Sequence, residues 1–335
     1  MTIFRHATSD LALHAVVTSR RALVYAAGGD ASVDRPAHVR AASSLAWIGD
    51  QIALVQDDAN FVALVDPLGG EARVIALPRG EGGLRQFDDE RGNKKFKLDL
   101  EACVAVDGDD GPLLLAFGSG STKRRRQVGM IDRWDDAKPR VIVADATSLY
   151  QCLESEPAFA GSDMNIEGTL IVDNALRFFG RGNGKARGNL SAVNATCDVP
   201  LDELLRYLRH PARREPPKPT NVVQYQLGTL QGIALGFTDA TVMGNDVVFS
   251  ATAEASDTAV DDGEVAGSVI GVITRSGRTR HAVLTDHAGQ PLVDKVEGVL
   301  LSRTSTTRAY IVIDADDHTR PSELCEVQLS GLWND

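Results

Sequence analysis

The stretch LEACVAVDGDDGPLLLAFGSG, residues 100–120, contains two short apolar strands joined by a turn of Asp, Gly and Pro. Apolar and β-branched runs bounded by such residues are typical of a β-hairpin. The pattern of a polar residue, an apolar strand, a turn and a second apolar strand recurs along the chain. The other copies read SSLAWIGDQIALVQDD (43–58), IEGTLIVDNALRFFGRGNG (166–184), LQGIALGFTDATVMGNDVVFSA (230–251) and VEGVLLSRTSTTRAYIVIDAD (296–316).

The copies are regularly spaced and indicate a repeat architecture. When they are aligned on the polar residue, equivalent positions lie about 60 residues apart. A third strand follows each hairpin, as in NFVALVDP (60–67), and a fourth usually follows it. Four antiparallel strands per repeat predict an all-β fold, a single β-propeller domain covering residues 1–335. Five copies predict five blades, or six if residues 1–42 supply most of another.

Two segments have helical periodicity, residues 145–159 and 201–210. Leu201, Leu204, Leu205 and Leu208 share one face of the second, which we expect to pack on the propeller rim. The last repeat has no evident fourth strand, whereas residues 11–18 and 21–27 form spare ones. An N-terminal strand that completes the last blade would close the ring and remove its exposed sheet edge.

The amino-acid composition limits the kinds of molecule that this chain is expected to bind. The chain has 35 Lys and Arg against 46 Asp and Glu, a formal charge of −11, and 5% aromatic residues. Such a chain is a poor candidate for binding nucleic acid or an anionic membrane. The N-terminus does not have the pattern of a secretory signal, and the four cysteines are widely separated. These features predict a cytoplasmic protein with reduced thiols.

A propeller brings the starts of its innermost strands together at one mouth of the axial channel. The aligned polar position holds Ser44, Glu101, Glu167, Gln231 and Glu297. Carboxylates that converge in a narrow channel raise one another's pKa, and a divalent cation relieves this. The all-oxygen set Glu101, Glu167, Gln231 and Glu297 is therefore a candidate metal site, with Ca²⁺ as the expected ion. The alternative is that these side chains hydrogen-bond backbone amides and join the blades.

The loops between second and third strands are expected to open on the same mouth. Two of them, GSGSTKRRR (118–126) and GRGNGKARGN (180–189), combine Gly with positive charge. Free backbone N–H groups beside Arg can hold an anion, and neither loop has Walker A spacing. Candidate anion-binding residues are Lys123, Arg124, Arg126, Arg181 and Lys185, unless these loops are simply solvated charge runs.

The chain resembles the phytase-like ("esterase-like activity of phytase") β-propellers of bacteria. The resemblance lies in VQDDANFVALVD (55–66), KLDLEACVAV (97–106), LLLAFGSGSTKRRR (113–126), MNIEGTLIV (164–172), RFFGRGNG (177–184) and VEGVLLSRTSTTRAYIVIDADDHTRPSELCEV (296–327). It implies a propeller fold and calcium-dependent chemistry, with Glu101, Glu167 and Glu297 as metal ligands and the arginine loops as phosphate binders. Gln231 departs from this pattern, since it stands where a carboxylate is expected.

These features predict a metal-assisted hydrolase of a small anionic substrate, such as a phosphate ester, an ester or a lactone, at the channel mouth. Asp58 or Asp314 would transfer the proton. Two alternatives stay open. One is a non-catalytic binding or scaffold propeller with a structural Ca²⁺, and the other is a glycosidase with paired carboxylates.

Overall fold

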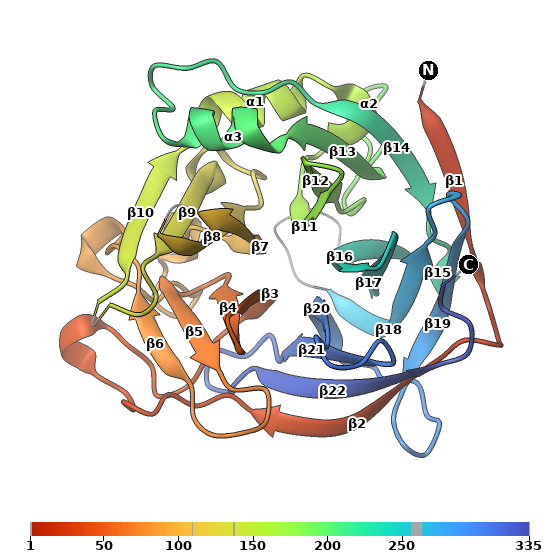
Figure 1. Cartoon of the computed structure of the whole chain (residues 1–335), viewed down its shortest axis with the longest axis horizontal. Helices are drawn as coiled ribbons and strands as arrows, with labels where there is room; N and C mark the ends of the chain where they lie inside the picture. Colours follow the sequence, from red (N-terminus) through yellow and green to blue (C-terminus); the bar gives the residue numbers. More distant parts are fainter. Residues whose placement is uncertain (1, 109, 137, 256–262, 335) are drawn as a thin grey trace.

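The computed structural model describes residues 2–108, 110–136, 138–255 and 263–334. Within these residues the strands form five blades around a central opening, as the sequence predicts (Figure 1). The strands of each blade are given from the inside outwards. The first blade consists of β3 (Ala42–Ile48), β4 (Gln51–Gln56), β5 (Phe61–Val65) and β6 (Arg73–Ala76). The second consists of β7 (Leu100–Gly108), β8 (Gly111–Gly118), β9 (Gln127–Asp132) and β10 (Arg140–Asp145). The third is β11 (Ile166–Val172), β12 (Ala175–Gly180), β13 (Asn194–Pro200) and β14 (Thr220–Gln226). The fourth is β16 (Ile233–Met243), β17 (Asp246–Ala255), β18 (Glu264–Ile273) and β19 (Thr279–Thr285), with the short β15 (Thr229–Leu230) beside β16.

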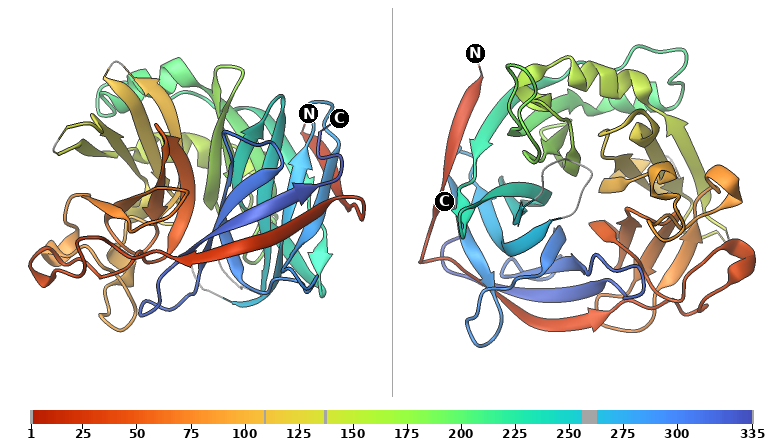
Figure 2. Two further views of the ribbon diagram at one scale, coloured as in Figure 1. Left: turned by 60° about the horizontal axis from the view of Figure 1, so that its bottom comes forward. Right: turned by 180° about the vertical axis from the view of Figure 1, so that it is seen from behind.

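The N-terminal strand closes the ring. The fifth blade is β20 (Lys295–Leu301), β21 (Arg308–Asp314) and β22 (Glu323–Ser330), and β2 (His14–Ala22) completes it by antiparallel pairing that sets Val16 opposite Gln328. The strand before it, β1 (Ile3–Ser9), runs parallel to both β14 and β19 and so joins the third and fourth blades (Figures 1 and 2). The predicted closure is confirmed, and the first strand adds a second link between blades.

The helices lie outside the ring. They are α1 (Thr147–Glu154), α2 (Pro157–Ala160) and α3 (Leu201–Leu208), and Pro157 separates the first two at the start of α2. Leu204 and Leu208 are buried in one apolar cluster with residues of the second and third blades, so the leucine face packs on the rim as predicted. Short 3₁₀ turns occur at Ala31–Val33, Glu81–Gly83, Lys94–Phe96 and Lys123–Arg125. None of the helices that the structure describes is long and apolar enough to span a membrane.

The hydrophobic core is divided among the interfaces between blades. Alternate side chains of a strand point to opposite faces of its sheet, and here each face meets a neighbouring blade. Phe178 and Phe179 of β12 show this, because Phe178 packs edge to face on Phe117 of the second blade and Phe179 on Phe237 of the fourth. Both ring centroid distances are 5.2 Å. Burial on both faces explains why the strands read as continuous apolar runs.

Each inner strand has a bulge near its start. The register shifts occur at Ser43, Glu101, Glu167, Thr238 and Glu297. Three of these are the predicted Glu residues, but two positions of the sequence alignment were wrong. The first blade contributes Ser43 and not Ser44. In the fourth blade Thr238 takes the place assigned to Gln231, which lies in the turn between β15 and β16, exposed to solvent, with φ of 50°.

The inner strands approach one another closely just after these bulges. A Cβ on Gly168 would lie 3.0 Å from the Cα of Asp239, and one on Gly298 would lie 2.4 Å from Leu45 Cδ1. The Gly of the recurring Glu-Gly pair is therefore required by packing at the axis.

One buried carboxylate connects these strands. Asp239, 1% exposed, accepts hydrogen bonds from Ser44 Oγ of the first blade and the Val299 N–H of the fifth, both at 3.1 Å. Ser44 Oγ in turn accepts from the Cys103 N–H of the second blade at 3.1 Å. Hydrogen bonds that join the blades are thus made by Asp239 and Ser44, whereas the sequence suggests Glu101, Glu167 and Glu297 for this role.

Asp239→Ala should reduce the stability of the whole ring. The Ser44 hydroxyl and the Val299 amide would be left buried without an acceptor, at a cost of about 1–3 kcal/mol for each group. Asp239→Asn keeps a carbonyl oxygen there and should cost less. Urea unfolding measures the difference, and equal midpoints for the Ala and Asn variants would contradict this role.

Deletion of residues 1–22 should abolish the cooperative melt or lower the melting temperature strongly, because it exposes the whole edge of β22. Deletion of residues 1–10 removes β1 alone and should have a smaller effect. Circular dichroism melts compare the two truncations. If both melt like the full chain, strand closure does not hold the ring together.

Candidate functional site

A polar pocket of about 330 Å³ lies at one mouth of the central channel, and we call it the axial pocket. The starts of inner strands and the loops between second and third strands line it, as predicted, and the loop between β6 and β7 adds a further wall. Of the predicted site residues, Asp58, Glu101, Glu167, Arg181, Glu297 and Asp314 line the axial pocket. Segments far apart in sequence therefore meet where the repeat places them.

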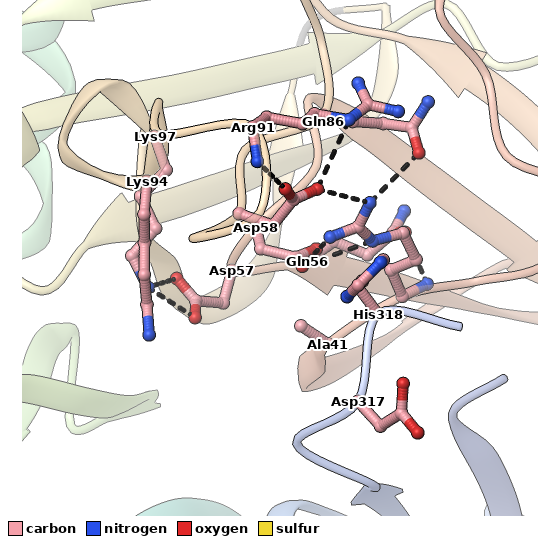
Figure 3. A network of polar contacts seen from close by, with 12 residues as sticks. Ala41, Gln56, Asp57, Asp58, Gln86, Arg91, Lys94, Lys97, Asp317 and His318 are labelled. Atoms are coloured by element: carbon pink, nitrogen blue, oxygen red, sulfur yellow. Dashed lines mark hydrogen bonds and ion pairs between the residues drawn. The ribbon is translucent and has the colours of Figure 1, made fainter. Parts of the chain in front are cut away.

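Three carboxylates form the first group in the axial pocket, Asp57, Asp99 and Glu101, with oxygen atoms within 4.8 Å of one another. Lys97 Nζ lies 2.6 Å from Asp57 and 2.8 Å from Asp99, and Arg125 Nη1 lies 3.0 Å from Asp99. Figure 3 shows Asp57 turned towards Lys97. Among the described residues, two cations thus face three carboxylates, of which Asp99 is buried and Asp57 and Glu101 are half-buried.

The pKa values of this group follow from that imbalance. Burial raises the pKa of Asp57 to about 7, and the charge of Lys97 only partly opposes it. Burial, with the charges of Asp57 and Asp99, raises the pKa of Glu101 well above its ordinary value. Although burial opposes it, Lys97 and Arg125 hold the pKa of Asp99 at about 2. Asp57 and Glu101 are therefore the members of the group that need further positive charge.

A second group lies on the blades that follow. Arg181 Nη2 is 2.5 Å from Glu254 and Nη1 is 3.6 Å from Glu167, while Lys295 Nζ is 3.1 Å from Glu297. Burial raises the pKa of Glu167 to about 8, although Arg181 opposes it, and burial also raises the pKa of Glu297. Among the described residues, Glu297 Oε2 is buried without a hydrogen-bond partner. In the part of the chain that the structure describes, the second group, like the first, therefore sets two cations against three carboxylates, and its carboxyl groups are protonatable.

The two predicted proton-transfer residues have different surroundings. Asp58 forms a short ion pair with Arg40, a residue only 2% exposed, and burial raises the pKa of Asp58. Burial raises the pKa of Asp314 well above its ordinary value, with Lys295 opposing, and the carboxylate of Asp314 makes no hydrogen bond with another described residue. Asp314 is thus the freer of the two.

Several predicted binding residues lie elsewhere. Arg124 pairs with Glu81 at 3.2 Å and Arg126 with Glu154 at 2.9 Å, so neither points into the axial pocket. Lys123, Lys185 and Gln231 are exposed and do not line it either. Arg181 does line it but is paired with Glu167 and Glu254. The run of basic residues in the sequence does not reveal which of its members turns inwards, and here it is Arg125.

Sequence reasoning missed Lys97 and Glu254. Lys97 follows the 3₁₀ turn Lys94–Phe96 and precedes β7, and Asp99 has φ of 59°, so no strand period relates the two residues. The sequence carries no signal for this pairing. Glu254 ends β17, where the fourth blade compensates for the absence of a Glu on its inner strand.

The donor set fits a hard divalent cation. Asp57, Asp99 and Glu101 offer oxygen ligands only, which suits Ca²⁺ better than a metal that prefers nitrogen or sulfur. The raised pKa values of Asp57 and Glu101 show which charges such an ion would neutralise. Glu167 and Glu297, two of the predicted ligands, are instead engaged with Arg181 and Lys295.

Without divalent cations, stability should fall as the pH rises from about 5 to 8.5. The folded pKa of Glu167, about 8, lies above its ordinary value near 4.5, so its contribution is complete below that ordinary value and is lost as pH rises through about 8. Glu167→Gln should flatten this slope, whereas Glu326→Gln, on the outside of β22, should not. Melting temperatures in chelator across this range provide the test, and parallel slopes for wild type and Glu167→Gln would be the contrary outcome.

Comparisons with known proteins find distant likenesses among solved structures and one matching family. The glutaminyl cyclase of Myxococcus xanthus is 11% identical, with 99% of each chain covered and a TM-score of 0.43. An α-L-arabinanase of Cellvibrio cellulosa is 12% identical, with 88% of this chain and 92% of that chain covered and the same TM-score. These likenesses are too distant to carry an argument about activity, and they give no support to the phytase-like resemblance.

Sequence comparison with curated proteins gives no match. Residues 38–329 do match a family model described as a family of unknown function, DUF6929. That range includes all of the pocket-lining residues described above. The chain therefore belongs to the DUF6929 family.

Proposed function

We propose that the axial pocket is the active site of a hydrolase that uses a bound divalent cation, with Ca²⁺ the expected ion. The observation that carries the proposal is the group Asp57, Asp99 and Glu101, one buried and two half-buried carboxylates within 4.8 Å, which outnumber the cations around them. Burying such charges is costly unless a cation compensates them. A purely structural set of ion pairs would be expected to balance more closely.

The three carboxylates of the first group differ in how many ion pairs they form with the protein's own cations. Lys97 and Arg125 pair with Asp99, and Lys97 also pairs with Asp57 at 2.6 Å, whereas Glu101 has no ion pair among the described residues, so Glu101 has the oxygen atoms most available for an ion. A bound cation in this position would polarise a substrate oxygen and favour the ionised form of a bound water. The strands and loops that carry these residues are held by the inter-blade packing, which keeps the ligands in place.

Proton transfer falls to the second group. Glu167 has a pKa of about 8 and is therefore protonated at neutral pH, which suits a general acid that protonates the leaving group. The Asn165 side chain donates to Glu167 Oε1 at 2.5 Å and orients the carboxyl group. Asp314 is the better candidate for the base, because Arg40 holds Asp58 in its ion pair.

The lining of the axial pocket limits the substrate. A volume of about 330 Å³ admits a small molecule or one end of a larger one. Among the described residues the lining has thirteen Asp and Glu against five Lys and Arg. Even with a divalent cation bound, this excess disfavours an anionic group inside the pocket. We therefore place an uncharged ester or lactone bond in the axial pocket and the negative charge of the substrate outside it, and a phosphate ester, the other predicted class, fits this lining less well.

Millimolar Ca²⁺ should raise the melting temperature, since a ligand at 100 times its Kd stabilises the folded state by about 2.7 kcal/mol. Hydrolysis of a panel of phosphate esters, aryl esters and lactones should appear with Ca²⁺ and disappear in chelator. Asp57→Asn plus Glu101→Gln should remove both effects. Glu167→Gln should keep the thermal shift and lose most of the activity, about 10²–10⁴-fold for a general acid.

The matched control is Glu326→Gln, which changes a carboxylate outside the axial pocket. An unchanged melt in Ca²⁺ and in chelator would overturn the cation site. A thermal shift without hydrolysis of any panel member would overturn the enzyme and favour a binding propeller with a structural Ca²⁺.

A further inference from the structure

A second cavity opens beside the axial pocket and has the opposite charge. It is a groove of about 830 Å³ between two 3₁₀ turns, Lys94–Phe96 and Lys123–Arg125, and we call it the basic groove. Among the described residues its lining contributes the cations Lys94, Lys95, Lys123, Arg124 and Arg125 and two acids, Glu81 and Asp89. A concentration of positive charge is unexpected in a chain of net charge −11.

The ion pairs of the basic groove leave part of this charge uncompensated. Glu81 pairs with Arg124 and Asp89 with Lys94, each at 3.2 Å, and Arg125 is paired with Asp99 inside the axial pocket. Within the described part of the chain, Lys95 and Lys123 have no carboxylate at ion-pair distance. Two cations in a concave site without a counter-charge are suited to a ligand that carries two negative charges.

An aromatic ring preorganises the basic groove. Phe96 is half-buried, and the guanidinium carbon of Arg124 lies 4.8 Å and Lys95 Nζ 5.0 Å from its ring centroid. Cation–π contacts of this kind restrict long side chains that would otherwise sample many rotamers. Their ordering is thus partly complete before a ligand arrives, which lowers the entropic cost of binding.

The basic groove and the axial pocket are continuous. Asp89, Lys94 and Arg125 line both cavities. A group bound near Lys95 and Lys123 would therefore leave the rest of its molecule pointing past Arg125 towards the first carboxylate group. The arrangement separates an anionic end from a bond held among carboxylates.

We propose that the basic groove binds a doubly charged oxyanion, and that this oxyanion is one end of the substrate whose other end is hydrolysed in the axial pocket. The second statement rests on the proposed function, whereas the first does not. Lys95 and Lys123 supply the charge for recognition, and Arg124 supplies a planar donor set for oxygen atoms. The basic groove then determines the specificity for a substrate with a doubly charged end, and the axial pocket determines which bond of that substrate is hydrolysed.

Sodium sulfate is a suitable probe, because it remains doubly charged at working pH. Isothermal titration in a buffer of constant ionic strength, with sodium chloride as the reference salt, should show saturable binding of sulfate to the wild type. Lys95→Ala plus Lys123→Ala should weaken it by about tenfold or more. Arg214→Ala plus Lys218→Ala, a pair of exposed cations in the segment 211–219, is the matched control and should bind like the wild type.

The calcium response separates the two proposals. The Lys95/Lys123 variant should keep the rise in melting temperature with Ca²⁺, and Asp57→Asn plus Glu101→Gln should lose that rise but keep sulfate binding. Wild type without saturable sulfate binding, or equal weakening in the control pair, overturns the basic groove. Sulfate binding that persists in a protein without a calcium response supports the groove and overturns the cation-dependent active site.

Discussion

The hydrogen bonds of the Asp239 carboxylate at the axis set the geometry on which the rest of the structure depends. Asp239 bonds Ser44 of the first blade and the Val299 amide of the fifth, and Ser44 bonds the Cys103 amide of the second. The third blade approaches the Asp239 backbone through Gly168. These contacts therefore connect all five inner strands to one another near the axis. A side chain larger than hydrogen at Gly168 would separate them.

That close approach creates the site. A strand that bulges just before the contact points one side chain into the channel mouth, and in three blades that side chain is Glu. Each bulge thus directs one side chain of its inner strand into the channel mouth. Because the mouth is narrow and shielded from solvent, burial raises the pKa of Glu101, Glu167 and Glu297 together. The raised pKa values of these three Glu residues in the axial pocket are a direct consequence of the packing at the axis.

The sequence predicts this fold well because the hairpin repeat is local and the closure follows from an unpaired edge. It also predicts that Glu101, Glu167 and Glu297 meet, since the repeat alone places them. It fails where a blade departs from the repeat. In the fourth blade the hairpin of β15 and β16 occupies the place where the alignment expected the inner strand to begin. The bulge of this blade is therefore at Thr238 and not at Gln231. It also fails for the basic loops, where adjacent residues such as Arg124, Arg125 and Arg126 turn to different partners, and only tertiary contacts decide which.

The two cavities explain how an acidic protein could select a charged ligand. A pocket dominated by carboxylates repels an anion, and this repulsion is strongest where solvent screening is weakest. Placing the cations Lys95 and Lys123 outside the axial pocket keeps them from neutralising Asp57 and Glu101, whose uncompensated charge is what would bind a cation. Arg125 lies between the two cavities and pairs with Asp99. The positive charge of the basic groove that lies nearest to the axial pocket is therefore already neutralised by Asp99. The separation of charge at Arg125 would thus permit the proposed cation binding and anion recognition to coexist at one channel mouth.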